Sequence, residues 1–220
     1  MTVVIAIDGP SGSGKSTVAR AVAAELGLPV LDTGAMYRAV TLAVLEAGVV
    51  LDDAAACATV AQSSEITLEG GVTVLDGRDV SREIRGPLVT GAVSIVSAHG
   101  EVREILVARQ RAWVARHGGG VVEGRDIGTV VFPDATVKVF LIASDDERAR
   151  RRHRDEVAAA RAVAVEDVKA ALDRRDAIDA GRAVSPLRPA GDAIVIDTTN
   201  LDVDSVVTEV VARARSSEAR

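Results

Sequence analysis

One short motif constrains this chain more than any other: residues 9–16 read GPSGSGKS and match the pattern G-x-x-x-x-G-K-[ST]. The apolar, β-branched run at residues 3–7 predicts a buried parallel strand before the motif, and apolar residues at helical spacing over 16–26 predict a helix after it. A strand, a glycine-rich loop and a helix in this order are the context that a phosphate-binding loop (P-loop) requires. They disfavour the alternative of a Gly-rich turn with a solvated lysine.

The P-loop binds phosphate mainly through its backbone. Glycines allow successive N–H groups to turn toward phosphate oxygens at the positive end of a helix dipole. Lys15 is expected to reach the β- and γ-phosphates of a nucleoside triphosphate, and the hydroxyl of Ser16 is expected to ligate Mg²⁺. The predicted ATP-binding residues are Gly9, Pro10, Ser11, Gly12, Ser13, Gly14, Lys15, Ser16 and Thr17.

Length and composition indicate one compact domain with mobile parts. The chain has 220 residues, 48% of them hydrophobic, which supplies enough core for such a domain. No apolar run approaches the roughly 18 residues of a membrane span, and the first residues resemble the predicted strand rather than a signal peptide. We therefore expect a cytoplasmic protein that contacts no membrane.

The cysteine and the histidines indicate no metal site. The single cysteine, Cys57, excludes an intrachain disulfide and a Cys-rich zinc site, and its Ala-rich helical surroundings predict a small, buried side chain. His153 is one of three histidines, and nothing in the sequence pairs it with another ligand.

Charge argues against one class of partner. The net charge of −6 disfavours sequence-independent binding to nucleic acid. We expect small molecules as partners and, as a separate expectation that charge does not decide, a monomer. Of 26 basic residues only Lys15, Lys138 and Lys169 are lysines, and 26 − 3 leaves 23 arginines. A bias toward GC-rich codons accounts for most of them. Arginine also binds phosphate with two parallel hydrogen bonds, so position must show which arginines matter.

The fold class follows from alternating strands and helices. Predicted strands near residues 3–7, 29–31, 120–124, 137–142 and 193–197 alternate with helices, which predicts a five-stranded parallel doubly wound sheet. The closing helix is expected over 203–215, with fraying from Ser216 onward. Ligands of such a sheet bind at the carboxyl ends of its strands.

Two segments interrupt this alternation, and we expect a core of about 1–34, 118–145 and 190–220. An inserted subdomain of about 35–117 should carry the acceptor site on a movable arm, with an Ala-rich helix, a three-stranded antiparallel sheet at about 65–80 and helices over 86–98 and 101–117. Trp113 is assigned to packing, and Arg109 and Arg111 to a solvated helical face. A lid of two helices should occupy about 146–189, with a junction near 162–165.

The lid segment is rich in charge. Residues 150–154 read Arg-Arg-Arg-His-Arg, and a run of this kind is typical of a solvated helical face. The same run also suits a lid that closes over a triphosphate, because such a lid must neutralise charge and exclude water.

Charged residues follow two of the predicted strands. Asp32, Thr33 and Gly34 should form a loop after residues 29–31, which places Tyr37 and Arg38 in the first turn of the next helix. A positive charge there is unfavourable unless an anion lies nearby, so Arg38 is a functional candidate as well as a possible surface residue. Arg125 and Asp126 should form an exposed charged pair just past the strand at 120–124, which favours function over a core salt bridge.

Several P-loop classes fit poorly. The only asparagine, Asn200, precedes Leu201, and no aspartate has a glycine three residues later, so the guanine and switch motifs of GTPases are missing. Motor and transport ATPases normally have an apolar strand that ends in a carboxylate, whereas here Arg125 precedes the acid Asp126. The arginine suggests a second anion in the site and hence a kinase of a small phosphorylated acceptor.

Four motifs together resemble the bacterial cytidylate kinase family. They are IDGPSGSGKS at 7–16, LDTGAMYR at 31–38, GRDIGTVVFPDA at 124–135 and RAVSPL at 182–187. The resemblance covers nearly the whole chain in the right order, and its second and third motifs are the specific ones. It implies transfer of the γ-phosphoryl group of ATP to CMP or dCMP, with Mg²⁺ accompanying the ATP.

The resemblance also implies roles for individual residues. The phosphate of CMP is expected at Thr33, Arg38, Arg125 and Arg182; cytosine at Ser94, Arg103 and Asp126; and the sugar at Arg175 and Asp179. The expected catalytic residues are Lys15, Arg38, Arg125 and Arg182, and the expected metal ligand is Ser16.

Two other functions stay open at this point. One is a different small-molecule P-loop kinase, of shikimate or gluconate type, in which an uncharged hydroxyl is the acceptor and a general base is required. The other is a non-enzymatic nucleotide-binding switch or assembly factor.

Overall fold

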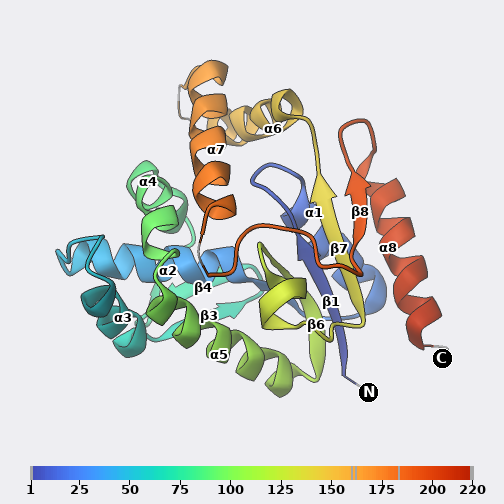
Figure 1. The fold of residues 1–220 in the computed structure, drawn as a ribbon, viewed down its shortest axis with the longest axis horizontal. Helices are drawn as coiled ribbons and strands as arrows, with labels where there is room; N and C mark the ends of the chain where they lie inside the picture. Colours follow the sequence, from blue (N-terminus) through green and yellow to red (C-terminus); the bar gives the residue numbers. More distant parts are fainter. Residues whose placement is uncertain (1, 160, 162, 183, 219–220) are drawn as a thin grey trace. The chain divides into compact units, whose positions relative to one another are not determined.

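The computed structural model describes residues 2–159, 161, 163–182 and 184–218. By internal contacts the chain divides into two compact units, Met1–Val30 with His117–Arg220 and Leu31–Arg116. We call them the sheet unit and the helical unit and describe each by itself. Figure 1 shows the course of the chain through both.

The large sheet has five strands in the order β2-β6-β1-β7-β8. The pairs β6/β1, β1/β7 and β7/β8 are parallel, which confirms the doubly wound parallel sheet. The bounds are β1 Val3–Asp8, β2 Val30–Asp32, β6 Gly119–Gly124, β7 Val137–Ile142 and β8 Ile194–Asp197.

Two helices cover one part of this sheet. They are α1, Lys15–Leu26, and α8, Val203–Glu218, and their apolar faces pack with β1 and β7 into one core that includes Ile5, Val22 and Val210. The helix α1 ends at Gly27, whose left-handed φ of 65° suits a glycine after a helix. The expectation that α8 frays from Ser216 is wrong, since its backbone stays helical to residue 218.

Two further helices of the sheet unit lie beyond the carboxyl end of β7 (Figure 1). They are α6, Asp145–Ala158, and α7, Val165–Ala180, and they pack on each other through Ala149, Val168 and Leu172. This arrangement confirms the predicted helix pair. Ala162 at the expected junction and Ala183 in the RAVSPL motif lie outside the described residues.

The helical unit contains four helices, a short 3₁₀ turn and the small sheet. The elements are α2 Thr33–Glu46, α3 Ala54–Ser63, β3 Ile66–Glu69, β4 Val72–Leu75, β5 Arg78–Asp79, η1 Glu83–Arg85, α4 Pro87–Val96 and α5 Gly100–His117, whose last residue belongs to the sheet unit. The strands form an antiparallel sheet in the order β3-β4-β5, as predicted. Its core joins residues of α2, such as Ala39, to Leu75 of β4 and Val89 of α4.

The predictions for Cys57 and Arg109, both in the helical unit, have different outcomes. Cys57 is fully buried, as expected, and burial raises the pKa of its thiol. Arg109 is not a solvated residue, because its guanidinium donates to the carbonyls of Ser64 and Gln62, both at 2.9 Å. It thereby satisfies carbonyl groups at the carboxyl end of α3, which a helix leaves without partners.

The predicted loop at residues 32–34 is absent. The helix α2 begins at Thr33, directly after β2, because the side chain of Asp32 accepts a hydrogen bond of 2.9 Å from the amide of Ala35 and caps the helix.

Within the described ranges, no helix combines the length and the apolar composition that a membrane crossing needs.

Candidate active site

The P-loop joins the end of β1 to the first turn of α1. Gly9, Gly12 and Gly14 have φ values of 147°, 80° and 91°, in the region that favours glycine. Space is also limiting, since a Cβ on Gly9 would lie 2.1 Å from the carbonyl oxygen of Leu141. Lys15, Ser16 and Thr17 occupy the start of α1, as the motif predicts.

Lys15 is buried and folded over its own loop. Its Nζ donates to the carbonyl of Pro10 at 2.6 Å. Burial lowers the pKa of Lys15 well below its usual value, and the positive charges of Arg125 and Arg175 act in the same direction. A group with this shift gains from a nearby anion, since negative charge restores its proton affinity. A triphosphate would supply that charge.

Ser16 contacts a carboxylate that the sequence reasoning missed. Its hydroxyl donates to Oε2 of Glu123 at 2.7 Å, and Glu123 is a buried residue near the end of β6. The strand β6 thus carries a carboxylate one residue before its end, so the contrast with motor and transport ATPases that was based on Arg125 and Asp126 is wrong. The signal was available, because Glu123 directly follows the apolar residues Val121 and Val122.

The pair of Ser16 and Glu123 tests whether magnesium fits this site. Mg²⁺ prefers oxygen ligands and usually takes only one or two from the protein. A hydroxyl and a carboxylate within 2.7 Å of each other provide such a set beside the P-loop. Within the described residues there is no cluster of three or more His, Cys, Asp or Glu with metal-site geometry. The residues therefore fit a magnesium ion that arrives with its nucleotide.

Arg125 and Asp126 do not form the predicted exposed pair. Asp126 is only 4% exposed, and Arg125 donates from Nε to the carboxylate of Asp179 at 3.1 Å. Arg182 bonds the other oxygen of the same carboxylate. Asp179, itself 1% exposed, thus holds side by side two of the arginines expected at the phosphate of CMP.

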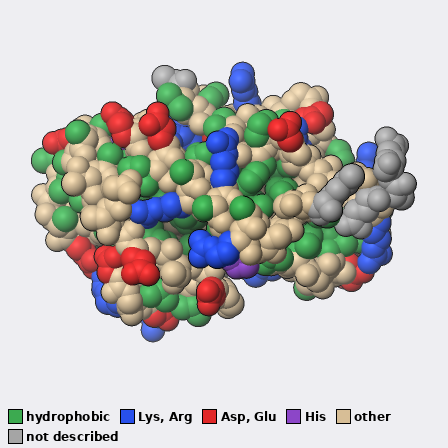
Figure 2. Space-filling view, turned by 90° about the horizontal axis from the view of Figure 1, so that it is seen from below, with side chains coloured by type: hydrophobic (Ala, Val, Ile, Leu, Met, Phe, Trp, Pro, Cys, Tyr) green, Lys and Arg blue, Asp and Glu red, His purple; other side chains and the backbone are tan. Residues whose placement is uncertain are grey.

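Arg175 completes a group of positive charges in the sheet unit. Burial lowers the pKa of Arg175 to about 10, and Arg125 adds to this effect while Asp179 opposes it. Its buried Nε has no hydrogen-bond partner within the described residues. Elsewhere charges are mixed: on the face drawn in Figure 2, Lys and Arg side chains are interspersed with acidic and hydrophobic ones.

The helix pair α6 and α7 contacts the P-loop directly. Arg148 of α6 donates to the carbonyl of Ser11 at 3.0 Å and pairs with Asp176 of α7. Asp176 in turn accepts a hydrogen bond of 3.3 Å from the amide of Ser11. A Cβ on Gly12 would lie 3.0 Å from the Cβ of Arg148, so this glycine also permits close packing of α6.

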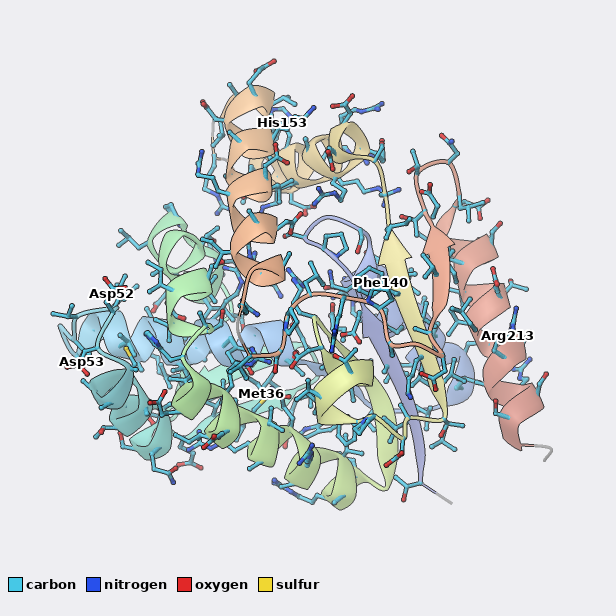
Figure 3. All side chains as sticks on the ribbon, in the orientation of Figure 1. Met36, Asp52, Asp53, Phe140, His153 and Arg213 are labelled. Atoms are coloured by element: carbon cyan, nitrogen blue, oxygen red, sulfur yellow. The ribbon has the colours of Figure 1, made fainter. Side chains whose placement is uncertain are left out.

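The run at 150–154 is partly solvated and partly bound. Arg151 donates to Oγ1 and to the carbonyl of Thr198 at 2.9 and 2.7 Å, and Thr198 donates to the carbonyl of Ser13 in the P-loop. Arg150 and Arg154 are exposed, as expected of a surface helix. His153 lies on the same helix, and it is labelled in Figure 3. Spacing alone could not have singled out Arg151 from this run.

The remaining predicted residues belong to the helical unit, and all four are buried: Thr33, Arg38, Ser94 and Arg103. Arg103 of α5 stacks over the ring of Tyr37 in α2, with 5.3 Å from its Cζ to the ring centre. Tyr37 therefore joins the candidate residues. The LDTGAMYR motif, which contains Tyr37, by itself assigns it no role.

Arg38 lies deeper in α2 than predicted. Because the helix begins at Thr33, Arg38 is in the second turn, so the argument from an unfavourable first-turn charge does not apply. Its Nη1 donates to the carbonyl of Ile84 and to Oγ1 of Thr90, both at 2.9 Å. These contacts orient the guanidinium within the helical unit.

A family model described as cytidylate kinase matches residues 5–216, which is nearly the whole chain. The chain belongs to the cytidylate kinase family. Among its relatives, the cytidylate kinase of Nocardia farcinica is 51% identical over 212 residues, which cover 94% of this chain and 91% of the relative.

Other similarities agree with this assignment. A bifunctional pantoate ligase/cytidylate kinase from Synechococcus sp. is 51% identical over 215 residues, and the match covers 94% of this chain but only 40% of that protein. The chain thus spans two fifths of the bifunctional relative. Among solved structures, shikimate kinase from Acinetobacter baumannii has a TM-score of 0.51 at 14% identity, covering 100% of this chain and 97% of the other. That likeness shows the shared P-loop kinase fold alone.

Proposed function

We propose that this cytidylate kinase family member transfers the γ-phosphoryl group of ATP to CMP or dCMP and releases ADP with CDP or dCDP. The observation that carries the proposal is the pairing of a P-loop with a carboxylate-bridged set of arginines in the same unit: Arg125 and Arg182 on Asp179. The P-loop accounts for the donor. The arginines account for an acceptor that is itself an anion.

The chemistry of this transfer is set by charge. The second pKa of a phosphate monoester is near 6, so the acceptor is largely a dianion at neutral pH and requires no general base. The obstacle is repulsion between the acceptor and the triphosphate. We assign Arg38, Arg125 and Arg182 to the acceptor phosphate, with the hydroxyl of Thr33 as a further hydrogen-bond donor. Lys15 is assigned to the phosphates of ATP. Together these charges would allow the acceptor phosphate to approach the γ-phosphate in line.

Magnesium is proposed as the accompanying ion, with Ser16 and Glu123 as the residues that would hold it. When bound, it would neutralise part of the charge of the ATP phosphates. The P-loop amides orient the same phosphates, and Lys15 brings a charge that is already desolvated.

Recognition of the base is assigned to Asp126, Ser94 and Arg103. A buried carboxylate can accept from the exocyclic amino group of cytosine, whereas uracil presents a carbonyl there and would leave the carboxylate unpaired. We therefore expect higher kcat/KM with CMP and dCMP than with UMP.

For the sugar, Arg175 and Asp179 are proposed. Asp179 can bind the sugar and also hold Arg125 and Arg182, because each carboxylate oxygen accepts more than one hydrogen bond.

An ADP-release assay with a panel of acceptors tests the function. The panel is CMP, dCMP, UMP, AMP, GMP and shikimate, each with ATP and Mg²⁺. The proposal expects turnover with CMP and dCMP first; equal efficiency with UMP would remove the specificity argument. Turnover with shikimate instead would support a kinase of an uncharged hydroxyl. ATP binding without any acceptor-dependent turnover would support a nucleotide-binding switch.

We also propose that the protein acts as a cytoplasmic monomer without nucleic acid. Light scattering across a range of protein concentrations tests the monomer, and a constant mass of one chain is the expected result.

A further inference from the structure

Asp8 is a buried carboxylate to which neither the motif nor the proposed reaction gives a role. It is the last residue of β1, it lies directly before the P-loop, and it is 4% exposed. Its Oδ1 accepts from the amide of Ile127 and its Oδ2 from the amide of Gly128, both at 2.8 Å. Both contacts lie within the sheet unit.

These two amides open the turn that follows Arg125 and Asp126. The turn, η2, spans Ile127–Val131 and is wound around the carbonyl of Asp126, which accepts from the amides of Val130 and Val131 at 2.9 and 3.2 Å. The backbone of Asp126 is thus fixed from within the turn, and the next two amides are fixed from outside by Asp8.

A second contact also confines this turn. A Cβ on Gly128 would lie 3.2 Å from Cγ and Cδ of Lys138, so the stem of that lysine packs against the glycine. Lys138 is held in place by the carboxylate of Asp192, at 2.8 Å from Nζ to Oδ2. Because Asp8 bonds its first two amides and Lys138 packs against Gly128, the turn has little freedom to shift.

A charged carboxylate is unfavourable at this buried position. Burial raises the pKa of Asp8 to about 6, the charge of Asp126 adds to the effect, and the two amides oppose it. An uncharged side chain would avoid this cost. A carboxylate differs from an amide in presenting two acceptors and no donor, which is what two adjacent backbone N–H groups require.

We propose that Asp8 is a positioning residue for the acceptor: through its two backbone hydrogen bonds it fixes the turn that sets Asp126 and Arg125. The inference rests on the proposed function, because it assigns Asp8 to base selection in that reaction. Asp8 touches neither substrate in this scheme. It acts through the placement of Asp126, on which discrimination between cytosine and uracil depends.

Asp8→Asn is the sharpest test. Asparagine keeps the shape of the side chain but offers only one acceptor oxygen, so either Ile127 or Gly128 must face an NH₂ group and the turn must move. We expect kcat/KM with CMP to fall about tenfold or more and the ratio of CMP to UMP efficiency to fall at least about threefold. The matched control is Asp202→Asn, because Asp202 also accepts a backbone amide, that of Ser205 at 2.8 Å, but is exposed at the start of α8.

The readouts separate the possible failures. Circular dichroism and ATP affinity of Asp8→Asn report whether the fold and the P-loop persist, and Asp8→Glu, which restores two acceptors, should recover part of the selectivity. If CMP and UMP efficiencies fall equally, Asp8 is merely structural and the inference is overturned. If wild type itself does not phosphorylate CMP, the proposed function fails instead.

Discussion

The hydroxyl of Ser16 donates a hydrogen bond of 2.7 Å to the carboxylate of Glu123, and so joins the P-loop to the strand β6. Glu123→Gln keeps the size and one acceptor but removes the charge. We expect the Mg²⁺ concentration for half-maximal activity to rise about fivefold or more, because a neutral amide is a weaker partner for a hard cation. Initial rates against free Mg²⁺ at saturating ATP provide the measurement. Glu25→Gln, at an exposed ion pair with Arg215, is the control, and an unchanged Mg²⁺ dependence would separate Glu123 from the metal.

Arg125→Ala tests the arginine pair on Asp179. The change removes a guanidinium from the proposed acceptor phosphate and leaves the hydrogen bond from Arg182 to Asp179 in place. Turnover with CMP should fall at least about tenfold while the fold persists, since arginine contributes charge stabilisation during phosphoryl transfer. The control is Arg213→Ala on α8, whose side chain is 56% exposed. Steady-state kinetics with circular dichroism checks both variants, and near-normal turnover would remove Arg125 from the mechanism.

Asp176→Asn tests the contact between α7 and the P-loop. The carboxylate of Asp176 accepts a hydrogen bond from the amide of Ser11 and pairs with Arg148. Both of these groups are donors that could otherwise bind a triphosphate. Removing this negative charge should lower the KM for ATP about two- to fivefold, because an anion no longer competes with phosphate for the same donors. Asp173→Asn, at an exposed position of the same helix, should leave that KM unchanged. A higher KM in Asp176→Asn would mean that the contact supports ATP binding instead.

The raised pKa of Asp8 predicts a specific dependence of stability on pH. Its pKa is about 6 in the folded protein, against an ordinary value of 3.8, chiefly because of burial. Between those values the folded protein keeps a proton that the unfolded chain has released. The free energy of unfolding should therefore decrease as pH rises through this window, by on the order of 3 kcal/mol from this one group, with no further contribution above it.

Urea unfolding of wild type and Asp8→Asn at several pH values checks this slope. Besides burial and the two backbone amides, the charged groups that act on Asp8 are the carboxylate of Asp126, which raises its pKa, and Lys15, which lowers it, and both are present in the variant. The difference between the two proteins should thus change with pH only up to about 6. Parallel curves across the whole range would contradict the prediction.

Arg109→Ala addresses the helical unit. Its guanidinium donates to the carbonyls of Gln62 and Ser64 at the end of α3, and their loss should lower the free energy of unfolding by about 1–2 kcal/mol. Arg116→Ala, exposed on the same helix, is the control. Denaturant midpoints provide the comparison, and equal midpoints would return Arg109 to the solvated face assumed from its spacing.

The order and type of nearly all the elements could be predicted from the residues. The apolar run at 3–7, the glycine loop and the helix up to Leu26 lie where the pattern placed them, and so do the Gly-Gly hairpin and the two helices α6 and α7. These features depend on neighbours a few residues apart, because strand and helix periodicity and turn chemistry are local. The error at residues 32–34 was local too, since an aspartate that caps a helix resembles one in a loop.

The partners of the charged residues could not be predicted in this way. Asp8 meets Ile127 across 119 positions of the chain, Ser16 meets Glu123 across 107, and Arg148 meets Ser11 across 137. A hydrogen bond between distant segments has no sequence period, and its donors are spread over several strands and helices. The P-loop motif therefore identifies a phosphate-binding protein by itself. Which carboxylates and arginines surround that loop depends on how the folded sheet unit brings β1, β6, α6 and α7 together. The chain has 23 arginines, and only the packing of these elements decides which of them lie within hydrogen-bond distance of the loop.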